Sequence, residues 1–73
     1  MKITRYAIKL THSDGSISWH TQGLPSNFGD FAFAILYSTP EHGRRARTAM
    51  LKKYPGLASM NPEIVPVTVE VQL

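Results

Sequence analysis

The chain has 73 residues, of which 42% are hydrophobic and 18% are charged, a balance that fits one small globular domain and excludes a disordered segment. It contains no cysteine, which excludes disulfide bridges and thiolate metal sites as sources of stability. The net charge of +3 favours acidic partners, and no apolar run approaches the ~20 residues that a membrane-spanning helix needs.

Two strands joined by a tight turn are predicted in the first third of the chain. Residues 3–11 alternate with a period of two, which is typical of a half-buried strand. Asp14-Gly15 then favours a hairpin turn, because glycine adopts a positive φ without strain. A second strand is predicted over 16–22, with Ile17 and Trp19 on one face.

Residues 30–38 are the ambiguous segment of the chain. Aromatic and β-branched residues alternate there with small and polar ones, which favours a strand. A short buried helix is the alternative, since Ala32 and Ala34 would tolerate one. We prefer the strand, because the segment is shorter than ten residues and its period is two.

A helix is predicted to begin at Thr39-Pro40-Glu41. This triplet provides a hydroxyl N-cap, a proline at the first helical position and an acid near the positive end of the helix dipole. The helix should end at Tyr54, because Pro55-Gly56 follows, and a loop should then lead to Pro62.

The last predicted strand covers 63–73, where valines recur at every second position from Val65 to Val71. Pro66 cannot donate a hydrogen bond to a neighbouring strand. This strand should therefore lie at an edge of the sheet, or should turn the nitrogen of Pro66 outward.

The order of elements is β-β-β-α-β, which predicts a single α+β domain over 1–73, with a mostly antiparallel four-stranded sheet and one helix packed on one face. We expect the face toward the helix to carry Tyr6, Trp19, Phe33 and Val67. The opposite, open face would then carry Ile3, Arg5, Ala7, Lys9, Ser18, His20, Gln22, Ala32, Ala34, Leu36, Ile64, Thr68 and Glu70.

The predicted helix divides into two stripes of residues spaced three and four apart. The apolar stripe comprises Gly43, Ala46, Arg47, Met50, Leu51 and Tyr54, and the basic stripe comprises Arg44, Arg45, Thr48, Ala49, Lys52 and Lys53. The basic stripe has four cations and no acid, so it would suit an acidic protein surface or a phosphate backbone. The alternative is a plain solvated face, because Glu41 can pair with Arg44 or Arg45, and Lys52 and Lys53 stabilise the helix dipole.

The candidate partner-binding residues follow from these two surfaces. The helix contributes Arg44, Arg45, Arg47, Thr48, Lys52 and Lys53, and the open sheet face contributes a second patch of Arg5, Lys9 and His20. The apolar row of Ala32, Ala34 and Leu36 on that open face would also suit a partner or a second copy of the chain.

Residues with catalytic or metal-binding patterns are not apparent in the sequence. His12, His20 and His42 lack the spacing of a metal site, and the five acids are dispersed. We therefore expect no catalytic residue, no metal and no cofactor. A one-helix domain of this length also leaves little room for a pocket of about 300 Å³ or more.

The hairpin HSDGSISW, the helix entry LYSTPEHGRRA and the closing strand EIVPVTVEV give a layout that resembles small accessory proteins of phages and mobile elements. The resemblance covers the whole chain and rests on size and layout, so it assigns no functional residues. Such proteins, including anti-CRISPR proteins and inhibitors of host polymerases, commonly bind one host macromolecule and block it.

The resemblance implies a non-enzymatic inhibitor or modulator in the cytoplasm of a host cell, with an acidic host protein surface as the favoured partner and no membrane contact. The charges of residues 1–10 also make an export signal unexpected. Two alternatives remain open: a small DNA- or RNA-binding protein that uses the same helix, and a homo-oligomeric assembly component such as a homodimer.

Overall fold

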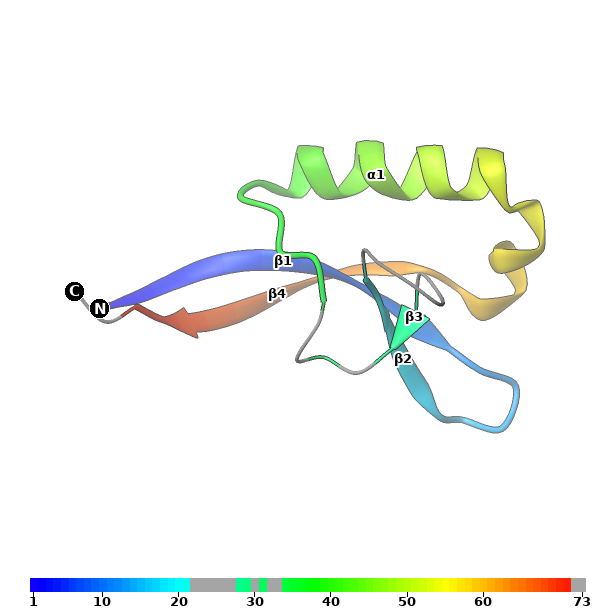
Figure 1. The fold of residues 1–73 in the computed structure, drawn as a ribbon, viewed down its shortest axis with the longest axis horizontal. Helices are drawn as coiled ribbons and strands as arrows, with labels where there is room; N and C mark the ends of the chain where they lie inside the picture. Colours follow the sequence, from blue (N-terminus) through cyan, green and yellow to red (C-terminus); the bar gives the residue numbers. More distant parts are fainter. Residues whose placement is uncertain (22–27, 30, 32–33, 72–73) are drawn as a thin grey trace.

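The computed structural model describes residues 1–21, 28–29, 31 and 34–71 (Figure 1). These residues form an α+β fold in which one main helix, α1 (Pro40–Lys53), lies on one side of an antiparallel sheet. The main strands are β1 (Lys2–Thr11), β2 (Ile17–His20) and β4 (Glu63–Glu70). A two-residue strand, β3 (Phe28–Gly29), pairs with β2, so the strand order is β3-β2-β1-β4.

The hairpin of β1 and β2 is confirmed. Gly15 has a φ of 89°, and its N–H donates to the carbonyl oxygen of His12 at 2.9 Å. Asp14 Oδ1 accepts hydrogen bonds from the backbone N–H and the hydroxyl of Ser16, at 2.9 and 2.6 Å. These bonds, the one from the hydroxyl above all, lower the pKa of the Asp14 carboxyl and hold the turn in one conformation.

The predicted strand over 30–38 is not confirmed in the described part of that segment, so the layout of four full strands is not confirmed either. Of this segment, Asp30, Ala32 and Phe33 lie outside the described residues. Ala34 and Tyr37 make isolated bridges, to Thr21 and Tyr6 respectively, and residues 34–37 are not helical either. Residues 34–37 pass from the end of β2 to the edge of β1, so they meet two strands in turn and form a continuous ladder with neither.

Helix α1 begins as predicted. Thr39 Oγ1 accepts a hydrogen bond from the backbone N–H of His42 at 3.2 Å, and Pro40 occupies the first turn. At the other end the Tyr54 N–H donates to the Met50 carbonyl at 2.8 Å. The predicted loop is instead a 3-10 helix, η2 (Pro55–Met60).

The register of β1 against β4 determines which face of the sheet each side chain occupies. Ile8 lies opposite Ile64, and Lys9 lies opposite Glu63. Directly opposed residues point to the same face. Ile64 faces α1, because its Cγ2 lies 3.3 Å from where a Cβ on Gly43 would be. The even-numbered residues of β1 therefore face the helix, and the odd-numbered residues face away.

This register corrects the predicted faces. Tyr6 is on the helix side as expected, but Trp19 opposes Lys9 and Val67 opposes Arg5, so both lie on the far side. Phe33 lies outside the described residues. Five residues expected on the open face lie on the helix side instead: Ser18, His20, Ile64, Thr68 and Glu70. Both faces carry apolar rows, so a period of two identifies the rows without indicating which one the helix covers.

Strand β4 is an edge strand, as Pro66 predicted. Pro66 lies opposite Tyr6, whose N–H and carbonyl bond to Tyr37 on the other side of β1, at 2.9 and 2.7 Å. The Tyr6–Pro66 pair is therefore a non-hydrogen-bonded pair, and the Pro66 nitrogen faces outward, where no donor is required.

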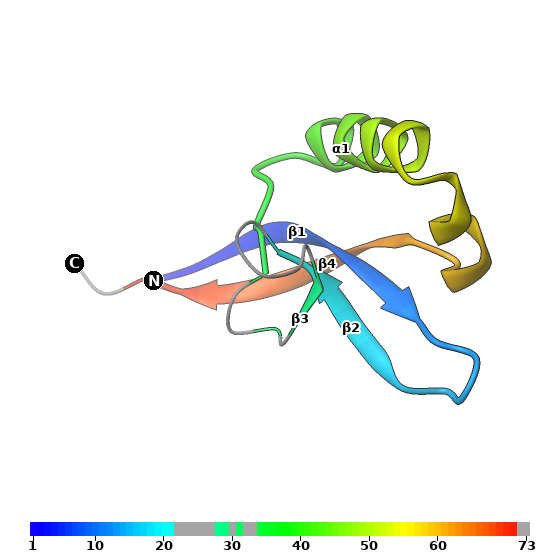
Figure 2. The ribbon, with the colours of Figure 1, turned by 45° about the vertical axis from the view of Figure 1, so that its right-hand side comes forward.

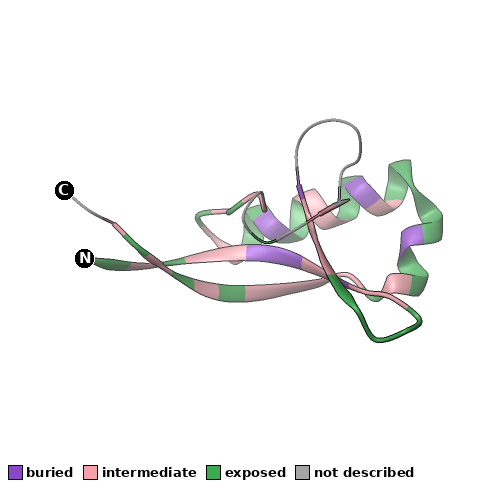
Figure 3. Cartoon of the chain, turned by 60° about the horizontal axis from the view of Figure 1, so that its bottom comes forward, coloured by how far each residue is buried: buried purple, intermediate pink, exposed green. Residues whose placement is uncertain are grey.

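The core is small and lies between α1, η2 and the middle of β1 (Figure 3). Ile8 and Leu10 are fully buried, and Met50 and Leu57 are nearly so. Partly buried side chains pack around these four: Tyr37, Ala46, Leu51, Met60 and Ile64. The first half of β1 and the last half of β4 extend beyond α1 as a two-stranded ribbon that brings Met1 next to Val71 (Figures 1 and 2).

The close approach of Gly43 to Ile64 generates a test. We expect Gly43→Val to lower the free energy of unfolding by about 1–3 kcal/mol, because the added atoms overpack the interface between α1 and β4. Urea titration of the full chain measures the change. Gly56→Val is the matched control, since a Cβ there would meet nothing within 4 Å.

If Ile64 is the obstacle, Ile64→Ala should recover part of the loss in the Gly43→Val background while destabilising the wild-type chain. Equal losses for the two glycine variants would contradict this account of the helix–sheet contact.

Candidate functional site

The six helix residues predicted to bind a partner lie together on α1. Five of them are exposed: Arg44, Arg45, Thr48, Lys52 and Lys53. Arg47 is half-buried, as expected for an arginine within the apolar stripe. We call this set of six residues the basic face of α1.

One acid lies beside the basic face. Glu41 Oε1 accepts a hydrogen bond from Arg44 Nη2 at 3.1 Å, and the two side chains are 62% and 55% exposed. An exposed pair of this kind contributes at most about 1 kcal/mol. A partner carboxylate can therefore replace Glu41 at little cost.

The second predicted patch is divided between the two faces of the sheet. Arg5 and Lys9 are on the far side from α1, and Lys9 Nζ lies 4.0 Å from Glu63 Oε2 on the neighbouring strand. His20 is on the helix side, because β2 places it next to Ser18 of the helix-facing row rather than next to Lys9. The grouping of Arg5, Lys9 and His20 as one surface is therefore wrong.

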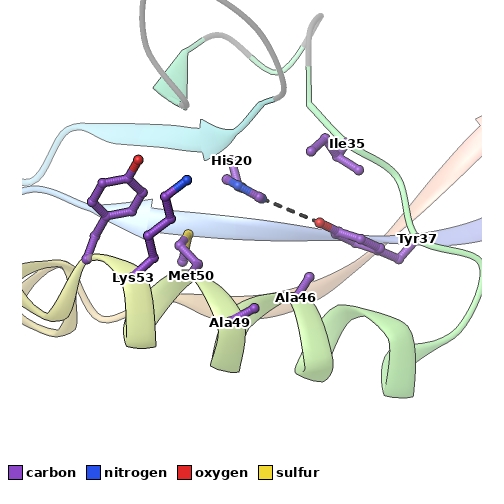
Figure 4. A pocket seen from close by; sticks show the side chains of 8 residues that line it. His20, Ile35, Tyr37, Ala46, Ala49, Met50 and Lys53 are labelled. Carbon is purple, nitrogen blue, oxygen red and sulfur yellow. Dashed lines mark hydrogen bonds between the residues drawn. The ribbon is translucent and has the colours of Figure 1, made fainter.

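An open groove lies between α1 and the end of β2 (Figure 4). Its volume is about 430 Å³, which corrects the expectation that this fold leaves little room for a pocket of about 300 Å³ or more. The lining residues come from β2, the segment before the helix, and the helix with its C-cap: His20, Ile35, Tyr37, Ala46, Ala49, Met50, Lys53 and Tyr54.

The groove has two polar side chains at one end and a cation at its rim. Tyr37 Oη lies 3.5 Å from His20 Nδ1 (Figure 4). Burial lowers the pKa of His20 and raises the pKa of Tyr37, so both side chains are uncharged at neutral pH. Lys53 Nζ lies 5.5 Å from the centre of the Tyr54 ring, a cation–π contact at the mouth of the groove.

Sequence reasoning missed the groove because its residues belong to three separated segments. Ala46 and Ala49 are the one local signal, since two small residues three positions apart leave a hollow on a helix. Their relation to His20 and Tyr37 depends on the bridges of Tyr37 to Tyr6 and of Ala34 to Thr21. The ambiguous pattern of residues 30–38 does not predict these bridges.

The described residues contain no group of three or more side chains that would hold a metal ion. His12 Nε2 and Ser18 Oγ lie 2.7 Å apart and form a hydrogen bond across the hairpin. His42 Nδ1 lies 3.3 Å from Ser38 Oγ at the start of α1. The histidines thus have separate local partners. Among the described helices, none has the length and apolar character to cross a membrane.

The fold and the site define a small α+β protein in which a basic helix face adjoins an apolar groove. Comparisons with protein-family models, with curated proteins and with solved structures found no match to this chain.

The half-buried His20 makes stability depend on pH. Its pKa is lowered from 6.5 by burial, so the folded chain binds fewer protons at this site than the unfolded chain. The contribution of His20 to the free energy of unfolding is fully present above pH 6.5, where its imidazole is neutral in both states. It is lost as the pH falls below that value, because the unfolded chain then binds the proton more readily. We expect the unfolding free energy of the wild type to decrease more between pH 7 and 5.5 than that of His20→Gln.

Urea titrations at several pH values measure this difference. His42→Gln is the control, because it removes an exposed histidine that lies outside the groove. If the free energies of unfolding of the wild type and of His20→Gln changed equally with pH, the pKa of His20 would be the same in the folded and the unfolded chain, and this account would be wrong.

Proposed function

We propose that the chain is a non-enzymatic binding protein that inhibits or modulates a host protein in the cytoplasm by covering an acidic surface. The observation that carries this proposal is the basic face of α1. Five of its six residues are exposed, and the acid beside it, Glu41, is held only by a weak surface pair.

One feature favours a protein over a nucleic acid. The groove beside the face is largely apolar, and apolar pockets next to charges are typical of protein recognition sites. A nucleic-acid backbone offers no apolar group to fill it.

Capture by immobilised full-length chain tests the proposal, with nuclease-treated lysate as the source of partners. We expect the wild type to retain a protein in a salt-sensitive manner. Arg45→Gln/Lys52→Gln should weaken this retention about five- to tenfold, because each lost surface charge pair is worth at most about 1 kcal/mol. The control is Lys2→Gln/Arg5→Gln, which removes the same charge from the far end of the sheet.

Labelled duplex DNA and single-stranded RNA test the alternative, a nucleic-acid partner. A salt-dependent mobility shift that is lost in Arg45→Gln/Lys52→Gln would replace the protein partner by a nucleic acid. Equal retention by both double variants would remove the basic face from the binding surface.

A second candidate, a homo-oligomeric component, is favoured by the face of the sheet away from α1. The ribbon beyond the helix exposes part of an apolar row made up of Ile3, Val65, Val67 and Val69. A two-stranded ribbon is marginal on its own in water. A second copy would offer the same row across a two-fold axis.

Light scattering of the purified chain tests this candidate. If the row is an interface, the wild type should be a dimer, and Val67→Lys should shift it toward the monomer by more than tenfold in dissociation constant. Thr68→Lys is the matched control, because it adds the same charge to the opposite face of the same strand. A monomeric wild type at high concentration would exclude the dimer.

A further inference from the structure

The groove beside α1 has a chemistry that the basic face alone does not explain. Its floor and walls are built from Ile35, Ala46, Ala49 and Met50, which offer no charge and no side-chain hydrogen-bond donor. The two alanines keep the helix side of the groove low, so space remains between α1 and β2. Such a surface favours an apolar group of matching size.

The charged and polar groups of the groove are unequally distributed. Among the described residues that line the groove, Lys53 is the one permanently charged side chain and none is an acid. His20 and Tyr37, at the inner end, face each other and are uncharged at neutral pH. A negative group is therefore favoured at the mouth, near Lys53, and is not required at the inner end.

The groove is also continuous with the basic face. Lys53 belongs to both, and Ala49 of the groove is the sequence neighbour of Thr48 on the face. A partner segment that places carboxylates along Arg45 and Lys52 would bring its next residues to the mouth of the groove. The charge of the face and the apolar lining thus describe one extended binding surface.

We propose that the groove is an anchor site for a bulky apolar side chain that is flanked by a carboxylate in an acidic protein segment. The apolar side chain fills the space over Ala46, Ala49 and Met50, and the carboxylate pairs with Lys53 at the mouth. This inference rests on the proposed function, because it specifies the chemistry of the partner that the basic face would attract.

An aromatic anion tests the groove without the partner. The probe is 8-anilinonaphthalene-1-sulfonate, whose fluorescence rises in apolar surroundings, and N-phenyl-1-naphthylamine is its uncharged analogue. We expect both to bind the folded chain. Lys53→Met should weaken binding of the anion about two- to fivefold and leave the neutral probe unchanged, because only the charge contact is lost.

Two matched controls localise the effect. Lys2→Met removes the same charge from the far end of β1, outside the groove and the basic face, and should change neither affinity. Ala49→Leu should reduce binding of both probes at least fivefold by filling the groove, whereas Ala58→Leu, at an exposed position of η2, should not. Leucine is a strong helix former, so Ala49→Leu should leave α1 intact.

Backbone amide shifts of the ¹⁵N-labelled wild type give a second measurement that needs no variant. Addition of the anion should move the signals of Ala46, Ala49, Met50 and Lys53 more than those of the far sheet face. Shifts confined to the valine row of β4, or equal effects of Lys2→Met and Lys53→Met, would overturn the proposal.

The outcomes also separate this inference from the proposed function. If the anion binds the groove while partner capture is insensitive to Arg45→Gln/Lys52→Gln, the anchor site is supported and the acidic partner of the basic face is excluded. If partner capture depends on the basic face while neither probe binds the groove, the proposed function is supported and the anchor site is excluded.

Discussion

The antiparallel pairing of β1 with β4 is the constraint on which the other features depend. Eight residue pairs, from Lys2 with Glu70 to Lys9 with Glu63, set the register of the two strands. A slip of one residue would exchange the two faces of the strand. Ile64 would then leave Gly43, and the valine row would turn toward the helix. The register therefore determines where the helix packs, which row stays open and where Pro66 faces outward.

The position of α1 follows from that register and in turn creates both parts of the site. Gly43 allows the helix to approach Ile64, and Met50 enters the core beside Ile8 and Leu10. With those contacts made, the helix presents Ala46 and Ala49 toward the end of β2, where the groove opens. Its remaining side carries the arginines and lysines into solvent. The basic face and the groove are thus two consequences of one helix orientation.

Local chemistry made the hairpin, the helix start and the helix end predictable. Gly15 at positive φ, the Thr39 cap and Pro55 each act within a few residues of the chain. Longer-range features were not predictable on the same grounds. Which sheet face the helix covers depends on Ile64 meeting Gly43, and the course of residues 34–37 depends on Tyr37 bonding to Tyr6. The basic face was predicted from helical spacing alone, whereas the groove required these tertiary contacts.

The small core gives partner binding a consequence for stability. Four buried side chains form the centre of the described core, and a domain of this size commonly has only ~3–5 kcal/mol of stability. A partner that covers the basic face and the groove recognises α1 only when the helix is docked on the sheet. Such binding adds about 2.7 kcal/mol when the partner is present at a hundred times its dissociation constant. The bound chain would thus be far more resistant to unfolding than the free chain, so the same helix would govern both recognition and persistence of the fold.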